Sequence, residues 1–196
     1  TAGRRGVAGT IFVEKVAGAK AEAGGSLAEV RAAAEKAVAN VRSMGMALTS
    51  CTVPAVGQPT FSLGESEMEI GIGIHGEPGR ERANLLSAAE IAATLAEPVI
   101  ADLGLQPGEE VAALVNGMGG TPLLELYVVA DALGQLLAGR HLLPAFFMVG
   151  NYVTSLEMAG CSITLMRLDE GLKSLLAAPA VTLAWPAWLG KARRPV

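Results

Sequence analysis

The sequence predicts an α/β protein: a small layered domain with a mixed β-sheet and helices, preceded by two further helices. Hydrophobic residues make up 51% of the chain but aromatic residues only 4%, so the apolar content is mainly Ala, Val, Leu and Ile. The 24 glycines and 10 prolines suit many short turns between strands and helices. Strand and helix patterns also alternate over most of the chain, with no internal repeat.

Two helices are expected first. Residues 11–23 carry apolar residues at helical spacing and end at Gly24–Gly25. A second helix begins at Ser26, with Glu29 three residues later as in a capping box, and runs to Gly45. Its apolar stripe comprises Leu27, Val30, Ala34, Val38 and Val41. Both helices should pack closely against another structural element. Their apolar pattern leaves open whether that element lies in this chain.

The alternating part of the chain follows a stretch rich in Pro and Gly, residues 49–66, which is expected to be loop or edge structure. Strict alternation from Glu67 to Ile74 predicts a strand. The other expected elements are a helix over 85–102 limited or kinked by Pro98, a buried strand over 111–115, a glycine-rich turn, a helix over 123–137 started by Pro122, strands over 146–149 and 162–168, and a short helix over 170–177.

Composition excludes several classes of protein. The net charge is −4, and no Lys/Arg cluster is dense enough to form a binding surface for nucleic acid. The basic residues 191–194 are expected to be a short solvated tail. The longest strongly apolar run, 142–149, contains Pro144 and is too short to cross a membrane. Cys51 and Cys161 fit no metal or Cys-x-x-Cys spacing, which predicts a reduced cytoplasmic protein without a metal site. There is no signal-peptide pattern, and the first residue, Thr1, hints at a fragment.

The most informative segment ends the predicted strand at His75. Side chains of a strand alternate between faces, so Met68, Ile70, Ile72 and Ile74 should share the core face. Gly71, Gly73 and His75 would share the other face, where missing side chains typically mark the close approach of a ligand. This pattern predicts a pocket with an imidazole at its mouth. The alternative is a surface histidine on a turn, with the glycines serving backbone packing.

Other glycine-rich stretches are less specific. Gly71, Gly73 and Gly76 match the dinucleotide fingerprint literally, but the first two lie within the predicted strand and Pro78–Gly79 delays the next helix, so that interpretation is rejected. Residues 116–122 could hold an anion at a helix N-terminus, although an ordinary tight turn explains them better. Residues 150–155 are equally ambiguous. His141 is expected to be solvated and without a role.

Five stretches together resemble the dihydroxyacetone (glycerone) kinase K family: Gly3 to Thr10, Cys51 to Ala55, Met68 to Gly79, Val115 to Pro122 and Thr154 to Gly160. The resemblance runs from the first residues to about Pro179. It implies that His75 is the catalytic residue and forms a hemiaminal with the carbonyl carbon of dihydroxyacetone. It also implies substrate binding by Gly71, Gly73, His75 and Gly76. Covalent capture would select ketones over glycerol and orient the terminal hydroxyl for phosphoryl transfer.

The chain departs from that family in length, because it corresponds to the C-terminal part of the K subunit. The resemblance implies that residues 1–45 belong to or contact a missing N-terminal domain, which carries the acid/base residues, while residues 46–196 form the C-terminal α/β domain. No cofactor is expected on this chain. ATP or ADP with Mg would lie on a nucleotide-binding L subunit or domain, the phosphotransferase-linked type being favoured and the fused ATP-dependent type left open. A homodimer is also implied.

Three functions can be weighed. A kinase part that anchors its substrate on His75 predicts a carbonyl-dependent adduct. A non-catalytic ligand-sensing or regulatory relative would keep the fold and use the same pocket, and the intact histidine block speaks against it. A purely structural oligomerisation domain fits poorly with a glycine-bare strand face beside His75.

Overall fold

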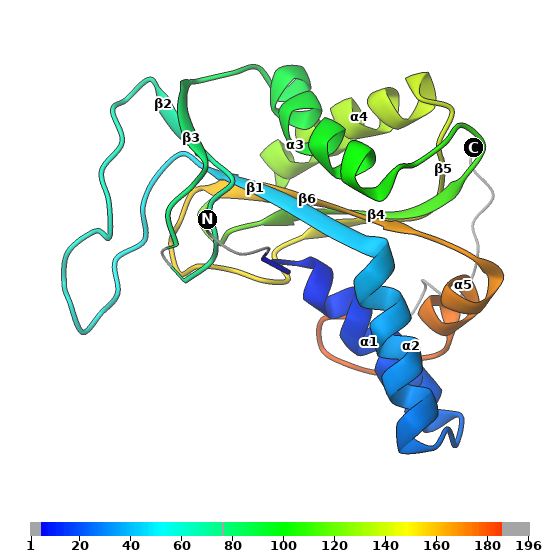
Figure 1. Ribbon diagram of the computed structural model, residues 1–196. Helices are drawn as coiled ribbons and strands as arrows, with labels where there is room; N and C mark the ends of the chain where they lie inside the picture. Colours follow the sequence, from blue (N-terminus) through cyan, green and yellow to red (C-terminus); the bar gives the residue numbers. More distant parts are fainter. Residues whose placement is uncertain (1–4, 76, 186–196) are drawn as a thin grey trace.

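The computed structural model describes residues 5–75 and 77–185 and shows three layers, with a six-stranded sheet between two layers of helices (Figure 1). The helices are α1 (Gly9–Glu22), α2 (Leu27–Asn40), α3 (Ala88–Leu103), α4 (Leu123–Gly139) and α5 (Glu170–Ala177). The strands are β1 (Val41–Ala47), β2 (Glu67–Ile70), β3 (Glu81–Asn84), β4 (Glu110–Gly117), β5 (Leu143–Gly150) and β6 (Gly160–Arg167).

The sheet is mixed, as the sequence predicted. Its strand order is β3-β2-β1-β6-β4-β5, and only the β4–β5 pair is parallel. Helices α3 and α4 cover one face, while α1, α2 and α5 lie on the other side (Figure 1). Strand β4 alternates between these layers: Val111, Ala113 and Val115 face the α3–α4 core, and Ala112 and Leu114 face the α1–α5 core. A strand that is covered on both faces has a continuous run of apolar residues, which is why β4 could be predicted from the sequence.

The first helical segment needs one correction. The capping box at the start of α2 is confirmed, because Ser26 Oγ accepts from the Glu29 N–H at 3.4 Å and the Glu29 carboxylate accepts from the Ser26 N–H at 2.8 Å. The prediction that this helix reaches Gly45 is wrong: it ends at Asn40, and residues 41–47 pair with β6 along their whole length. Sheet hydrogen bonding outweighs the helical spacing of Val41.

The apolar stripe of α2 is mostly outside the core. Ala37 is the buried residue of this helix, whereas Leu27 is 87% and Val38 is 56% exposed. Helix α1, in contrast, buries Phe12 and Val16 in the core below the sheet. The expected boundary between residues 45 and 46 falls inside β1. A contact between these helices and a further domain stays a prediction.

The strand that leads to His75 is shorter than predicted. Strand β2 ends at Ile70 because Gly71 adopts a positive φ of 79°, which turns the chain out of the sheet. The return strand β3 was not predicted, because Glu81–Asn84 is polar and lies at the sheet edge. Helix α3 begins at Ala88 rather than at residue 85, since Ser87 and Glu90 form a second capping box. The later strands and helices lie where they were expected, with bounds differing by a few residues.

Candidate functional site

Loops from several strands meet at one end of the sheet. They are residues 48–52 after β1, 71–80 after β2, 118–122 after β4 and 151–159 between β5 and β6. In Figure 1 this end of the sheet lies on the left. Such an end, beyond the carboxyl ends of the parallel strands β4 and β5, is where α/β sheets commonly bind ligands.

Asn116 fixes the loop that follows β5. Its side chain is fully buried at the end of β4, and its Oδ1 accepts from the N–H groups of Tyr152 and Val153 at 2.8 and 2.9 Å. Its Nδ2 donates to the Val153 carbonyl at 2.8 Å. Sequence reasoning missed this role, although a polar residue ending a buried apolar strand must find hydrogen-bond partners.

The glycine-rich loop after β4 is built for close backbone packing. Gly119 has a φ of 123°, and a Cβ placed there would lie 2.0 Å from the Leu156 carbonyl oxygen. A Cβ on Gly120 would lie 2.4 Å from the Glu157 carbonyl oxygen. The Thr121 hydroxyl donates to the Gly160 carbonyl at 2.8 Å and accepts from the Gly160 N–H at 2.7 Å. These contacts favour the tight turn over the anion site for residues 116–122.

Ser155 connects these loops to the histidine segment. Its Oγ donates to the Ile74 carbonyl at 2.7 Å, and its N–H donates to the Met118 carbonyl at 2.7 Å. Ile72 and Ile74 pack with Met118 in a small apolar cluster below this segment. The backbone just before His75 is therefore held by residues from the loop after β4 and from the β5–β6 loop.

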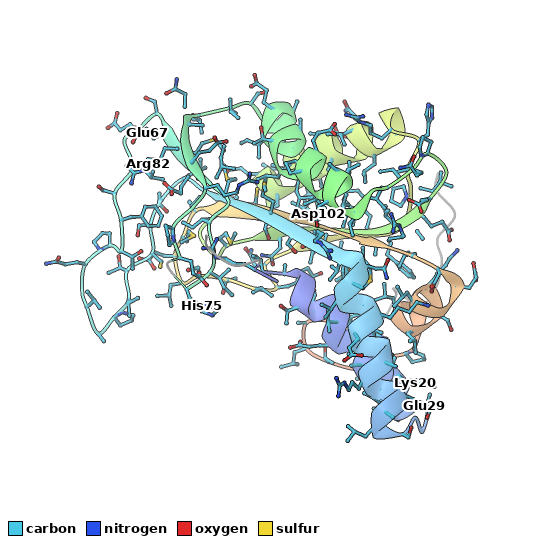
Figure 2. The ribbon with its side chains drawn as sticks, viewed as in Figure 1. Lys20, Glu29, Glu67, His75, Arg82 and Asp102 are labelled. Carbon is cyan, nitrogen blue, oxygen red and sulfur yellow. The ribbon has the colours of Figure 1, made fainter. Side chains whose placement is uncertain are left out.

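The His75 side chain lies at the outer surface of the loop cluster, 79% exposed (Figure 2). Its backbone N–H donates to Oε2 of Glu77 at 2.8 Å, and its Nδ1 lies 3.3 Å from Oε1 of the same carboxylate. Nε2 is thus the ring nitrogen directed away from Glu77. Glu77 was not among the predicted site residues, although its place two residues after His75 could have suggested a partner for the ring.

The charge of Glu77 is stabilised by these contacts. Partial burial raises the pKa of its carboxyl group, but hydrogen bonds from the N–H groups of His75 and Glu77 and from the His75 ring outweigh it. The net pKa lies below the ordinary value. An ionised acceptor therefore lies beside His75 at neutral pH.

The face beside Gly71 and Gly73 is not empty, contrary to the expected open pocket. A Cβ on Gly71 would lie 2.7 Å from Cγ of Arg80, and one on Gly73 would lie 2.1 Å from Oε2 of Glu77 and 2.8 Å from Cδ of Arg5. The Arg5 guanidinium also donates to the Gly71 carbonyl at 3.0 Å. Glu77 and Arg80 lie there because the turn at Gly71 folds the following residues back over this face, while Arg5 reaches it from the segment before α1. Gly76 lies outside the described residues.

Four other features were singled out in the sequence: the dinucleotide match, His141, the two cysteines and the basic residues 191–194. The literal dinucleotide match is followed by strand β3 and not by a helix, in line with its rejection. His141 is exposed in a turn with a φ of 55°, its carbonyl accepting from the Gly108 N–H. Cys51 and Cys161 are buried free thiols. The basic residues 191–194 lie outside the described residues.

Within residues 5–75 and 77–185, no three His, Cys, Asp or Glu side chains gather where they could hold a metal ion. Over the same residues, none of the helices has the length and apolar character needed to cross a bilayer. A cavity of about 850 Å³ does lie beside residues 41–44 of β1, and Arg5 and Arg80 line it.

Nearly the whole chain, these loops included, is similar to known proteins. The model of the Dak1 domain family matches residues 1–184. The dihydroxyacetone-binding subunit DhaK of PTS-dependent dihydroxyacetone kinase 1 from Listeria innocua is 50% identical over 186 residues, which cover 94% of this chain and 56% of that subunit. Human triokinase/FMN cyclase is 40% identical over 190 residues, covering 94% of this chain and 33% of that protein. The chain thus spans about half the length of the DhaK subunit it matches.

Solved structures agree with the fold. The dihydroxyacetone kinase of C. freundii, in complex with AMP-PNP and Mg²⁺, matches with a TM-score of 0.82 and 32% identity, over 93% of this chain and 34% of that one. A dihydroxyacetone kinase operon co-activator, Dha-DhaQ, matches with a TM-score of 0.81 and 35% identity, over 89% of this chain and 55% of that one.

Proposed function

We propose that this chain, which belongs to the Dak1 domain family, is the dihydroxyacetone-binding part of a dihydroxyacetone kinase. The observation that carries the proposal is the geometry at His75: an exposed imidazole on a segment fixed from below by Ser155, with Nδ1 against Glu77 and Nε2 directed away from it. The name of the Listeria innocua relative, a dihydroxyacetone-binding subunit, supports the same substrate.

Capture of the substrate would be covalent. Nε2 of a neutral His75 adds to the carbonyl carbon of dihydroxyacetone, and the C=O π electrons move to the oxygen, which takes a proton from water. The ring then releases a proton to solvent, which leaves a neutral hemiaminal. Glycerol has no carbonyl and cannot react in this way. The anchored substrate then presents a terminal hydroxyl to a phosphoryl group, and holding the two in line supplies much of the rate enhancement. Because Arg5, Glu77 and Arg80 occupy the space beside Gly71 and Gly73, the substrate-binding role of Gly71, Gly73 and Gly76 rests on the family resemblance alone.

The rest of the machinery would come from outside this chain. His75 is too exposed to exclude water, so we expect a further domain to close over it. The exposed Leu27 and Val38 of α2 are one surface that such a domain could cover, with residues 1–45 in contact with it. ATP or ADP with Mg²⁺ would lie on a partner L subunit or domain, and the structure of the C. freundii kinase with AMP-PNP and Mg²⁺ supports such a nucleotide. A cytoplasmic homodimer completes the proposal.

Calorimetry tests this function. The chain as its gene encodes it, titrated with dihydroxyacetone and separately with glycerol, should bind the ketone alone. His75→Ala should abolish binding, whereas His141→Ala, a control at the other histidine, should leave it unchanged. Equal binding of ketone and glycerol, or full binding by His75→Ala, would contradict the proposal.

A second candidate is a regulatory protein that senses the same ligand. Its support is the match to the operon co-activator, at a TM-score of 0.81 and 35% identity. Both candidates predict ligand binding, so phosphoryl transfer separates them. A kinase part consumes nucleotide when supplied with dihydroxyacetone and its nucleotide-binding partner, while a regulator binds the ligand without turnover.

A further inference from the structure

The Glu77 carboxylate contacts His75 at two points. Oε2 accepts the His75 backbone N–H at 2.8 Å, which fixes the turn, and Oε1 lies 3.3 Å from Nδ1 of the ring. The Glu77 side chain is 35% exposed and that of His75 is 79% exposed, so the carboxylate lies inside and the ring outside. The Glu77 side chain thus fixes both the backbone and the ring orientation of His75.

The contact to Nδ1 decides where a neutral imidazole carries its proton. An ionised carboxylate can only accept a hydrogen bond, so a neutral ring that bonds to it must donate from Nδ1. Nε2 then keeps its lone pair. An isolated histidine side chain prefers the opposite form, with the proton on Nε2 and the lone pair on the nitrogen that is crowded by its own backbone. Glu77 therefore favours the form in which the exposed nitrogen of His75 is the nucleophile.

Gly73 provides the space for this carboxylate. A Cβ at Gly73 would lie 2.1 Å from Oε2 and 2.5 Å from Cδ of Glu77, so no other residue fits there while Glu77 keeps its position. Gly73 is itself buried. This close approach gives the glycine a task distinct from substrate contact, because it lets Glu77 reach back to the histidine.

We propose that Glu77, placed against Gly73, is a positioning residue that holds His75 with its proton on Nδ1 and makes Nε2 the attacking atom. The inference rests on the function proposed above. In the step itself the Nε2–C bond forms, the C=O π bond breaks, and its electron pair goes to oxygen, which takes a proton from water. The ring becomes positively charged beside the Glu77 carboxylate and then releases its Nδ1 proton to solvent, so no oxidant or reductant is needed.

Two measurements on the chain as its gene encodes it test the role. Nitrogen NMR of the isotope-labelled imidazole, without substrate and at mildly alkaline pH, reports which nitrogen of His75 carries the proton. Calorimetry reports the affinity for dihydroxyacetone. The variants are Glu77→Ala, Glu77→Gln and Gly73→Ala, with Glu65→Gln as a control that removes an exposed carboxylate elsewhere.

In the wild type and in Glu65→Gln, the proton should be on Nδ1. In Glu77→Ala and Gly73→Ala it should move toward Nε2, and the affinity should fall about ten-fold, the loss expected for one charge-assisted hydrogen bond. Glu77→Gln keeps an acceptor oxygen and should recover part of both signals. A merely structural role for Glu77 would lower stability without moving the proton.

The outcomes separate this inference from the proposed function. If the wild type binds dihydroxyacetone and Glu77→Ala changes neither the proton position nor the affinity, the role of Glu77 is overturned and the function stands. If the wild type binds no dihydroxyacetone, the proposed function fails, and the nucleophile that Glu77 was inferred to prepare fails with it.

Discussion

The hydroxyl of Ser155 donates a 2.7 Å hydrogen bond to the carbonyl of Ile74, the residue immediately before His75. Ser155 is itself 4% exposed and belongs to the loop that follows β5, far from His75 in the sequence. This single bond ties the histidine segment to the central part of the sheet. The position of the exposed imidazole consequently depends on a buried hydroxyl.

Replacing Ser155 by Ala should loosen the histidine segment. The change leaves the Ile74 carbonyl without this donor, and the free energy of unfolding should fall by about 1–3 kcal/mol. Hydrogen exchange should speed up around residues 72–79 more than elsewhere. Ser62→Ala, in an exposed loop, is the control and should change neither quantity. Unchanged exchange in Ser155→Ala would show that the bond does not hold the segment.

Two glycine substitutions should have opposite effects. Gly119→Ala would bring a Cβ to 2.0 Å from the Leu156 carbonyl oxygen at a φ of 123°, and should cost about 3 kcal/mol or more. Gly134→Ala, within α4 where a Cβ meets nothing within 4 Å, should stabilise the protein by about 0.5–1 kcal/mol. Denaturant unfolding of both variants measures this, and equal effects would contradict the packing described for the loop after β4.

The sequence allowed the layered α/β fold to be predicted because β4 and the cap of α2 depend on local patterns. It misplaced the end of α2 because Val41 continues the helical spacing while its backbone pairs with β6. The predicted strand was extended through Gly71 because the alternation of apolar residues indicates only which face each side chain takes. It does not reveal the positive φ of Gly71 that ends β2. His75 was found from its block of neighbours. The contacts of Asn116 and Ser155 with distant loops have no local signature, so only the folded chain reveals them.

The cap of α3 should make stability depend on acid. The Ser87 hydroxyl and N–H lower the pKa of Glu90, so the folded state releases this proton more readily than the unfolded state. Ionised Glu90 therefore contributes its full stabilisation of the folded state above the ordinary pKa of glutamate. This contribution is lost as pH falls from the ordinary pKa through the lowered pKa of the folded state. Thermal unfolding across this acidic range should show the difference between wild type and Ser87→Ala shrinking as pH falls. A constant difference would contradict the role of Glu90.

The thiol of Cys161 should be inert in the folded protein. Burial raises its pKa to about 12, and its residue is 4% exposed, so it forms almost no thiolate at mildly alkaline pH. In a Cys51→Ala variant, a thiol-reactive disulfide dye should label Cys161 only after denaturant is added. Rapid labelling of the native variant would mean that this part of β6 opens readily.

The central claim is that His75 binds a ketone covalently, and carbon NMR of dihydroxyacetone labelled at its carbonyl carbon tests it most directly. With the chain as its gene encodes it, the ketone signal should be replaced by that of a carbon bonded to four atoms. This new signal should be present in His141→Ala and absent in His75→Ala. A bound ligand whose carbonyl signal stays that of a free ketone would contradict the claim.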